Sequence, residues 1–392
     1  MIQRAISSSV LTDAGKYPVI SLVGCRQSGK TTLAKMLFSE KRYTNLENPE
    51  DREYALSDPK SFLTQSSTGM IIDEAQTVPE LFSYIQVISD EINKPGYYIL
   101  TGSNNFSLME SISQSLAGRI SNFTLLPFSK AEIDNTPLQM HSLPEHIIKG
   151  FFPRLHQEHI EPNGFYLNYV QTYLERDVRK IKNITNLSTF QRFITLCAGR
   201  VGQLLNISSL ADDCDISFHT AASWLSLLET SYIIYLLKPY HKSFNKRLTK
   251  MPKLYFYDTG LLCTLLKVHN EDTLNTHPFK GNIFENFIIS ELTKWKYHGS
   301  RIYDLYFWRD NHGLEVDCIL EIDHSRQIPI EIKSSSTIKS EHFKSIEKYN
   351  ILSSQSPVHS HLIYGGEANQ TRSICNVNSW RVVGTNIKTL FE

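Results

Sequence analysis

The residues best suited to chemistry lie in a short loop near the N-terminus. Residues 24–31 are Gly-Cys-Arg-Gln-Ser-Gly-Lys-Thr, matching the pattern G-x-x-x-x-G-K-[ST], and they follow an apolar run and open a helical stretch. Glycines in such a loop let backbone N–H groups surround phosphates, and the positive end of the following helix favours the same anion. Lys30 is expected to reach the β- and γ-phosphates, and the Thr31 hydroxyl to hold Mg²⁺. The predicted phosphate-contacting residues are Gly24, Cys25, Arg26, Gln27, Ser28, Gly29, Lys30, Thr31 and Thr32.

Two carboxylates form a second element of the same chemistry. In residues 70–74, Met-Ile-Ile-Asp-Glu, a predicted strand ends in Asp73 and Glu74. Asp73 is placed to order Mg²⁺ through water, and Glu74 to polarise the water that attacks the γ-phosphate. Each motif alone has a structural explanation, as a glycine-containing turn or a pair of helix N-caps. The two motifs together, each in its strand context, predict that the chain binds and hydrolyses ATP.

Two more polar residues are candidates for this site. Ser103 ends the strand-like run 96–103 and is suited to sensing the γ-phosphate, or equally to capping the next helix. Arg119 is a candidate finger that neutralises transition-state charge, in its own subunit or in a neighbour's. A surface salt bridge is the more common role of a lone arginine.

The last third of the chain holds a separate set of charged residues. Glu285 lies in a helical run, Asp317 in a strand-like run, and Glu331 and Lys333 in the next one. Period-two spacing puts Glu331 and Lys333 on the same face of their strand. The order of these residues resembles the PD-(D/E)xK core of restriction-type nucleases, although an E-x-K pair alone also lines many solvent-exposed strands. An inert domain that keeps only this fold is the alternative.

The nuclease resemblance implies a role for each residue. Asp317, Glu331 and the Ile332 carbonyl would ligate Mg²⁺ or Mn²⁺, and Glu285 would support the metal or its water. Lys333 would polarise the nucleophile or the scissile phosphate.

Composition narrows the function classes. The 392 residues correspond to two or three domains of about 150 residues each. Forty Lys+Arg balance forty Asp+Glu, so any DNA or RNA site must be a local patch. The longest apolar run is far short of a membrane span, and the N-terminus lacks a signal sequence, so we expect a cytoplasmic protein. Six scattered cysteines without a CxxC pair predict reduced thiols that mostly serve in packing.

The pattern of elements explains how the first site would be positioned. Residues 18–134 alternate strand-like runs (18–23, 70–75, 96–103) with helical stretches (30–40, 79–92), which predicts a parallel sheet covered by helices. Residues from about 145 to 230 have mainly helical spacing. After about residue 280, a helix and three strand-like runs predict a third, α/β unit.

The middle of the chain has the element order of a winged helix. Residues 207–229 predict helix, turn and helix, and a hairpin with a basic connection follows. Four basic residues of this wing are candidate contacts to a nucleic-acid backbone, while a solvated loop on a domain used for packing is the alternative. The second helix carries no Lys or Arg, so we do not expect base-specific reading. The candidate nucleic-acid contacts are Lys242, Lys246, Arg247 and Lys250.

Taken together, these motifs resemble a known family, the AAA-type P-loop ATPases that carry a DUF4143 region. The matching motifs are Gly24 to Thr32, Asp73-Glu-Ala-Gln76 with Pro79-Glu-Leu81, Thr101-Gly-Ser103, Leu116-Ala-Gly-Arg119, Tyr173-Leu-Glu-Arg-Asp177 and Leu254 to Leu262. The resemblance implies an ATPase core, a winged-helix middle and a nuclease-like end. We accordingly predict an α/β protein with a P-loop NTPase parallel sheet (1–140), a helical and winged-helix module (141–265), and a restriction-endonuclease-like α/β domain (266–392).

The leading hypothesis is a DNA-associated, ATP-hydrolysing protein of AAA type with a metal-dependent phosphodiesterase at its C-terminal end. Its expected cofactors are ATP and Mg²⁺, with Mn²⁺ as an option at the nuclease-like site. The alternative is an ATP-dependent regulatory switch or binding module whose nuclease-like domain is catalytically silent. DNA is the expected partner, while a protein partner and assembly into an oligomer are left open.

Overall fold

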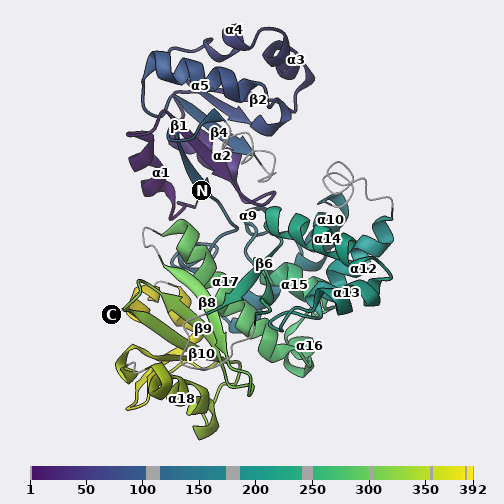
Figure 1. The fold of residues 1–392 in the computed structure, drawn as a ribbon, viewed down its shortest axis with the longest axis vertical. Helices are drawn as coiled ribbons and strands as arrows, with labels where there is room; N and C mark the ends of the chain where they lie inside the picture. Colours follow the sequence, from purple (N-terminus) through teal and green to yellow (C-terminus); the bar gives the residue numbers. More distant parts are fainter. Residues whose placement is uncertain are drawn as a thin grey trace. The chain divides into compact units, whose positions relative to one another are not determined.

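The computed structural model describes residues 2–102, 115–173, 186–240, 250–299, 303–353, 356–384 and 386–391 (Figure 1). The chain divides into two compact units, each with a sheet of its own. The first unit comprises Met1–Phe128 with the short segments Thr230–Tyr232 and Tyr297–Ser300. The second comprises Ser129–Glu229, Ile233–Lys296 and Arg301–Glu392.

The sheet of the first unit is entirely parallel. Its strands, in spatial order, are β2 (Arg42–Asn45), β3 (Met70–Asp73), β4 (Tyr98–Gly102), β1 (Val19–Val23) and β5 (Ile120–Thr124). The prediction of a parallel sheet is thereby confirmed, as are its three buried strands β1, β3 and β4. The edge strands β2 and β5 have no apolar run to mark them, because they are polar and partly exposed. Since all strands run the same way, the carboxyl ends of β1, β3 and β4 meet at one edge.

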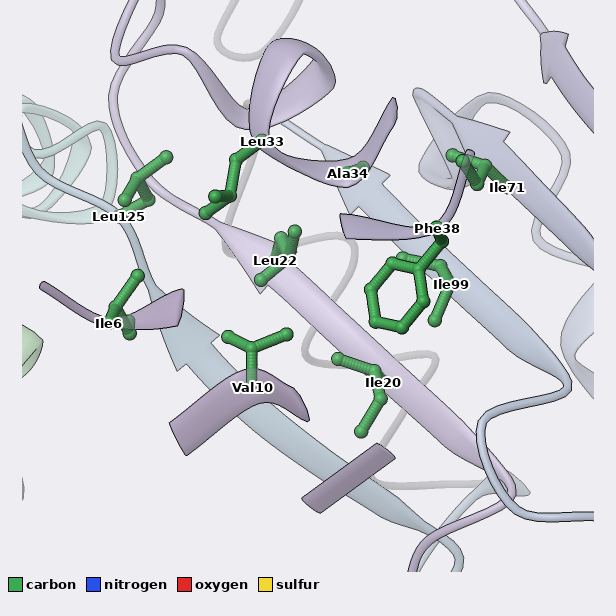
Figure 2. Packing of buried hydrophobic residues seen from close by; sticks show 10 residues of the cluster. All are labelled: Ile6, Val10, Ile20, Leu22, Leu33, Ala34, Phe38, Ile71, Ile99 and Leu125. Carbon is green, nitrogen blue, oxygen red and sulfur yellow. The ribbon is translucent and has the colours of Figure 1, made fainter. Parts of the chain in front are cut away.

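Helices cover this sheet and seal its core. They are α1 (Ser7–Ala14), α2 (Lys30–Leu37), α3 (Pro49–Ser57), α4 (Pro59–Leu63) and α5 (Leu81–Ile92), with a 3-10 turn at Ala75–Thr77. Figure 2 shows how Ile6 and Val10, at the start of α1, pack with Ile20 and Leu22 of β1 and Leu33 of α2. All five side chains are almost completely buried. The N-terminal segment is therefore part of the core rather than a loose tail.

The second unit combines a helical layer with a mixed sheet. Its helices are α7 (Lys130–Ile133), α8 (Leu143–Lys149), α9 (Pro153–Gln157), α10 (Pro162–Tyr173), α12 (Leu187–Ala198), α13 (Ile207–Cys214), α14 (Phe218–Thr230), α15 (Thr259–Leu265), α16 (Glu271–Thr276), α17 (Lys280–His298) and α18 (Lys344–Ser353), with 3-10 turns at Ser340–Phe343, Pro357–His359, Trp380–Val383 and Ile387–Phe391. The helix, turn and helix predicted for residues 207–229 are α13 and α14. Across the described ranges, no helix has the length and hydropathy needed to cross a bilayer.

The predicted hairpin is built into the larger sheet. The strands, in spatial order, are β12 (Gln370–Thr371), β13 (Asn376–Ser379), β11 (His361–Tyr364), β10 (Gln327–Lys333), β9 (Glu315–Glu321), β8 (Asp304–Arg309), β6 (Ile234–Pro239) and β7 (Lys253–Phe256). Strand β6 pairs antiparallel with β7 and parallel with β8, where Lys238 lies opposite Tyr306. The hairpin thus extends the sheet that carries Asp317, Glu331 and Lys333.

Two sequence features turn out to serve the packing of the chain. Asp258, in the family motif that follows β7, caps α15 through the Leu261 N–H at 3.0 Å and also accepts the Phe151 N–H at 2.8 Å. Its side chain is buried, so this motif joins α15 to the α8–α9 connection.

All six cysteines are buried and none forms a disulfide, which confirms the prediction of packing thiols.

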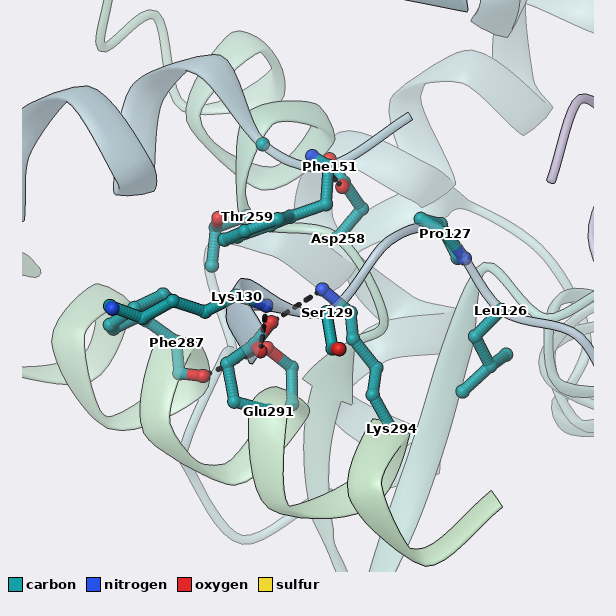
Figure 3. Close-up of polar contacts among 12 residues, drawn as sticks. Leu126, Pro127, Ser129, Lys130, Phe151, Asp258, Thr259, Phe287, Glu291 and Lys294 are labelled. Atoms are coloured by element: carbon teal, nitrogen blue, oxygen red, sulfur yellow. Dashed lines mark hydrogen bonds and ion pairs between the residues drawn. The ribbon is translucent and has the colours of Figure 1, made fainter. Parts of the chain in front are cut away.

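A buried ion pair fixes the first residues of the second unit (Figure 3). Glu291 and Lys294, both on α17, have fully buried side chains, and the Lys294 Nζ lies 2.6 Å from Glu291 Oε1. The other oxygen of Glu291 accepts the backbone N–H of Lys130 at 2.6 Å. The Lys294 ammonium also lies 3.9 Å from the centre of the Phe151 ring. Burial raises the pKa of Glu291, and Lys294 opposes that shift.

Breaking this pair on one side should be far more costly than replacing both partners. We expect Lys294→Met to lower the free energy of unfolding by about 3–5 kcal/mol, because it leaves the Glu291 charge buried without a counter-ion. The double variant Glu291→Gln, Lys294→Met should recover most of that loss, since the glutamine can still accept the Lys130 N–H. Denaturant unfolding of the three proteins measures both effects. A double variant no more stable than Lys294→Met would contradict this account.

Candidate nucleotide site and a second carboxylate cluster

The loop between β1 and α2 has a backbone shape that only certain residues permit. Gly24 has φ +144°, and a Cβ at this position would lie 2.0 Å from the carbonyl oxygen of Leu125. Gly29, which begins α2 as its N-cap, has φ +92°, and Gln27 has φ +61°. The two glycines of the motif therefore stand where a side chain would clash or strain the backbone. Between them the loop turns back to the amino end of α2.

Lys30 lies inside this loop. Its Nζ donates to the carbonyl oxygens of Gly24 at 3.0 Å and Cys25 at 2.7 Å, and the residue is 7% exposed. Burial lowers the pKa of Lys30, while the negative charges of Glu74 and Asp73 oppose that shift. The lysine is thus held at the loop by two of the loop's own carbonyl oxygens.

The Asp73 carboxylate gathers hydroxyl groups from three other elements. Its Oδ2 accepts the Thr31 hydroxyl of α2 at 2.8 Å and the Tyr43 hydroxyl of β2 at 2.9 Å. Its Oδ1 accepts the Thr101 hydroxyl of β4. Burial and the adjacent Asp73 charge raise the pKa of Tyr43, so this phenol stays protonated and donates. The structure therefore brings together Thr31 and Asp73, the two residues assigned to magnesium, and adds Tyr43, which the sequence analysis did not single out.

The donor set at this edge fits a magnesium ion held jointly with a nucleotide. Within the described ranges, no group of three or more His, Cys, Asp or Glu side chains is arranged to hold a metal by itself. Mg²⁺ prefers oxygen ligands and usually takes only one or two carboxylates, completing its shell with water and substrate phosphates. Thr31 and Asp73 supply one hydroxyl and one carboxylate.

Glu74 has a direct partner of its own. It has φ +54°, and the side-chain amide of Gln76 donates to its Oε2. Gln76 belongs to the quoted Asp-Glu-Ala-Gln motif, but the sequence analysis gave it no role. The spacing of two residues across the turn at Ala75–Thr77 is the signal that could have paired it with Glu74.

Other predicted residues of this site have varied positions. Ser28 is buried and its hydroxyl donates to the Cys25 carbonyl at 3.0 Å, Arg26 is half-buried, and Gln27 and Thr32 are exposed. Ser103 lies outside the described residues, as do Lys242, Lys246 and Arg247 of the candidate DNA patch, whose fourth member, Lys250, is described and exposed.

Arg119 lies at the opposite edge of the sheet from the loop. Its carbonyl accepts the Val19 N–H at the start of β1, whereas the loop follows the end of that strand, five residues or about 16 Å further on. Its guanidinium forms two hydrogen bonds to the Asp90 carboxylate, at 2.6 and 2.8 Å. Within its own chain Arg119 is thus a salt-bridge partner of Asp90 and does not reach the loop. A role in a neighbour's site stays a prediction.

The second cluster lies in the second unit, where β9 and β10 run side by side. Lys333 Nζ lies 2.6 Å from Glu331 Oε1 and 3.8 Å from Asp317 Oδ2, as expected for residues that share one face. Asp317 Oδ2 also accepts the Ile332 N–H at 2.8 Å. Glu331 is 4% exposed, and its Oε2 has no hydrogen-bond partner in the described part of the chain. Burial and the nearby Asp317 raise the pKa of Glu331 well above its usual value.

Glu285, the helical member of the cluster, is engaged by strand β7. Lys253 Nζ lies 3.0 Å from Glu285 Oε1, and the Tyr255 hydroxyl donates to the same oxygen. Lys253 also pairs with Glu315, and these two carboxylates raise its pKa despite burial. Although Lys253 lies only three residues beyond Lys250, it is 2% exposed and faces these carboxylates. Its alternation with Tyr255 in a buried strand was the signal for this orientation.

Comparison with known proteins identifies the family. Family models match at residues 16–134 (AAA domain), 140–272 (domain of unknown function, DUF8612) and 280–382 (domain of unknown function, DUF4143). The uncharacterized proteins Mb2031c of Mycobacterium bovis and Rv2008c of Mycobacterium tuberculosis are each 30% identical over 340 residues, covering 86% of this chain and 75% of theirs. The chain belongs to the DUF4143 family of AAA-type P-loop ATPases.

Family membership confirms the resemblance drawn from the motifs and supports ATP binding and hydrolysis by the AAA domain. Among solved structures, the Walker-type ATPase PABY2304 of Pyrococcus abyssi is 15% identical, with a TM-score of 0.44, covering 66% of this chain and 94% of that one.

In this P-loop ATPase, Gly24→Ala should both destabilise the first unit and remove nucleotide binding. The new Cβ would overlap the Leu125 carbonyl, and we expect a loss of about 2–5 kcal/mol from steric clash and backbone strain together. Gly118→Ala is the matched control, because Gly118 also has a positive φ (+77°) but open space around it. It should lose only about 1–2 kcal/mol. Thermal unfolding and ATP titration measure both variants, and equal losses would refute the clash.

Proposed function

We propose that this chain binds MgATP at the loop 24–31 and hydrolyses it there. The observation that carries the proposal is the contact between the Thr31 hydroxyl and Asp73 Oδ2, 2.8 Å apart, beside Lys30. These groups come from α2 and from the end of β3, so the fold itself assembles them. A cation-binding hydroxyl and carboxylate next to a phosphate-binding lysine are the parts that nucleotide hydrolysis requires.

Each residue has a distinct role in the proposed reaction. The loop N–H groups and Lys30 bind the β- and γ-phosphates, and Thr31 with Asp73 would hold Mg²⁺, which supplies charge neutralisation to the phosphates when bound. Glu74 accepts a proton from the attacking water. The side-chain amide of Gln76 donates to Glu74 Oε2 and so orients the Glu74 carboxylate.

Two variants separate binding from hydrolysis. Lys30→Ala should abolish ATP binding, because it removes the buried cation from the loop. Glu74→Gln should bind ATP with near-normal affinity and hydrolyse it about 10²- to 10⁴-fold more slowly, since the amide cannot accept a proton. Titration with a fluorescent ATP analogue and a phosphate-release assay measure the two steps. Tight ATP binding by Lys30→Ala would overturn the assignment, and normal turnover by Glu74→Gln would place the base elsewhere.

We further propose that the ATPase acts on DNA and has the three modules predicted from sequence, with boundaries at 1–140, 141–265 and 266–392. The separate matches at 16–134, 140–272 and 280–382 support that division. The succession of α13, α14 and the β6–β7 hairpin supports a winged helix, and the exposed side chain of Lys250 supports a basic face on it. A cytoplasmic location stays a prediction.

A second candidate function is metal-dependent cleavage of phosphodiester bonds by the C-terminal domain. The observation in its favour is the buried Oε2 of Glu331, which has no partner among the described groups and lies in a cluster with Asp317 and Lys333. Asp317 and Glu331 are hard oxygen donors suited to Mg²⁺ or Mn²⁺. The alternative, a silent domain, is favoured by the lysines that already neutralise Glu331 and Glu285.

Metal binding discriminates between these two readings of the cluster. If the site is a nuclease, Asp317→Ala should remove the Mn²⁺ binding that remains in Lys30→Ala, and Lys333→Ala should lose cleavage of DNA while keeping the metal. Calorimetry with MnCl₂ and a plasmid-cleavage assay on the full chain measure this. No difference in Mn²⁺ binding between Lys30→Ala and its Asp317→Ala derivative would contradict the nuclease proposal and favour a catalytically silent domain.

A further inference from the structure

Arg4 is a buried arginine that contacts the P-loop at the carbonyl group of Ser28. It is 5% exposed, and its Nη1 donates to the Ser28 carbonyl at 2.8 Å. Its Nη2 donates to the carbonyls of Leu126, at 2.7 Å, and Pro127, at 3.3 Å. The guanidinium also lies 5.0 Å from the centre of the Phe128 ring. One side chain thus joins the loop to the segment that follows β5, and all of these residues belong to the first unit.

The hydrophobic core fixes where Arg4 stands. Ile6 and Val10, which follow it in the chain, are buried against β1 and α2 in the cluster of Figure 2. The Arg4 carbonyl accepts the Ser7 N–H at 3.1 Å, at the start of α1. The backbone of Arg4 is therefore held by packing, and its planar side chain has a defined direction.

The Ser28 carbonyl and the Gly29 N–H belong to one planar peptide unit. In a trans peptide these two groups point in opposite directions, so a bond that holds the carbonyl toward Arg4 turns the Gly29 N–H away from it. Gly29 is the N-cap of α2, where backbone N–H groups bind anions. A hydrogen bond from a cation is stronger than a neutral one and polarises the peptide, which makes its N–H a better donor.

The same segment contacts the other end of the loop. The Leu125 N–H donates to the Val23 carbonyl at 2.8 Å, and the Leu125 carbonyl occupies the space that a side chain on Gly24 would need. The next residue, Leu126, donates its N–H to His298 Nε2 at 3.1 Å. Residues 125–127 are therefore bonded to the loop at both of its ends, directly at Val23 and through Arg4 at Ser28.

We propose that Arg4 is a positioning residue of the nucleotide site: it orients the Ser28–Gly29 peptide toward the phosphates of ATP and couples the loop to residues 125–127. The proposal deepens the function proposed above and rests on it. It names a cation that acts on the triphosphate through a peptide group and makes no contact with the nucleotide itself.

Two variants of Arg4 test this role. Arg4→Met removes the donors and keeps an unbranched buried chain, and Arg4→Lys keeps the charge but loses the fork that reaches two segments at once. We expect ATP to bind about 10- to 100-fold more weakly to Arg4→Met and about tenfold more weakly to Arg4→Lys. Arg42→Met is the matched control, because Arg42 is an exposed arginine of β2 in the same unit, and its ATP affinity should equal that of the wild type.

The measurement is displacement of a fluorescent ATP analogue by ATP and, separately, by inorganic tripolyphosphate, with the nucleotide-free melting temperature of each variant as a check on folding. Because Arg4 acts on the phosphate contact, both competitors should weaken by the same factor. If Arg4→Met does not fold, Arg4→Lys carries the test alone.

The results that would overturn the proposal are distinct from those that would overturn ATP binding. A lower melting temperature with unchanged ATP and tripolyphosphate affinities in the Arg4 variants would make Arg4 purely structural. A loss confined to ATP would place its effect on the base or sugar. Retained ATP binding in Lys30→Ala would instead refute the nucleotide site itself.

Discussion

The first unit depends on hydrogen bonds that protein hydroxyl groups donate to one buried carboxylate. Asp73 is 6% exposed at the end of β3, where an ionised carboxylate without hydrogen bonds would be very costly. Hydroxyls of Thr31, Tyr43 and Thr101 meet this need, and they come from α2, β2 and β4. The carboxylate therefore fixes four elements relative to one another at the sheet edge. The same arrangement leaves a hydroxyl and a carboxylate together beside Lys30, which is why we propose that hydrolysis takes place at this edge.

The segment that follows β5, residues 125–130, is held by hydrogen bonds to buried charged side chains. Arg4 binds the carbonyls of Leu126 and Pro127 within the first unit, and two residues beyond its boundary Glu291 binds the Lys130 N–H within the second. Each contact uses a buried charged side chain, which is costly to leave without a partner. The last residues of the first unit and the first residues of the second are thus each held by a charge-assisted hydrogen bond within their own unit.

Much of the nucleotide site could be predicted because its signals are local. Gly24, Gly29 and Lys30 lie within one short stretch of sequence, so their spacing can be recognised directly. Asp73 ends a strand that is apolar enough to be recognised as well. The contact between Glu331 and Lys333 follows from the period of a strand. In each case the residues that cooperate are neighbours in sequence, or are brought together by the register of parallel strands.

The contacts that sequence analysis missed join residues far apart in the chain. Arg4 reaches Ser28 across 24 residues and Leu126 across 122, so no periodic pattern marks it. Lys253 pairs with Glu285 and Glu315, and its charge alone does not reveal that its strand continues the neighbouring sheet. Arg119 lies in one of the family's motifs, yet it pairs with Asp90 at the edge of the sheet opposite the loop. The motif alone does not specify at which end of the strands it lies.

The most direct test of this account is the effect of magnesium on ATP binding by Asp73→Asn. Calorimetry of the full chain, with Mg²⁺ and with a chelator, measures this effect. The amide keeps the size of the side chain but not its charge, and so cannot help to hold the cation. We predict that wild-type protein binds ATP more tightly with Mg²⁺ than without, and that Asp73→Asn loses this difference while retaining metal-free ATP binding. An unchanged response to Mg²⁺ in Asp73→Asn would contradict the assignment of the metal, and with it the proposed hydrolytic site.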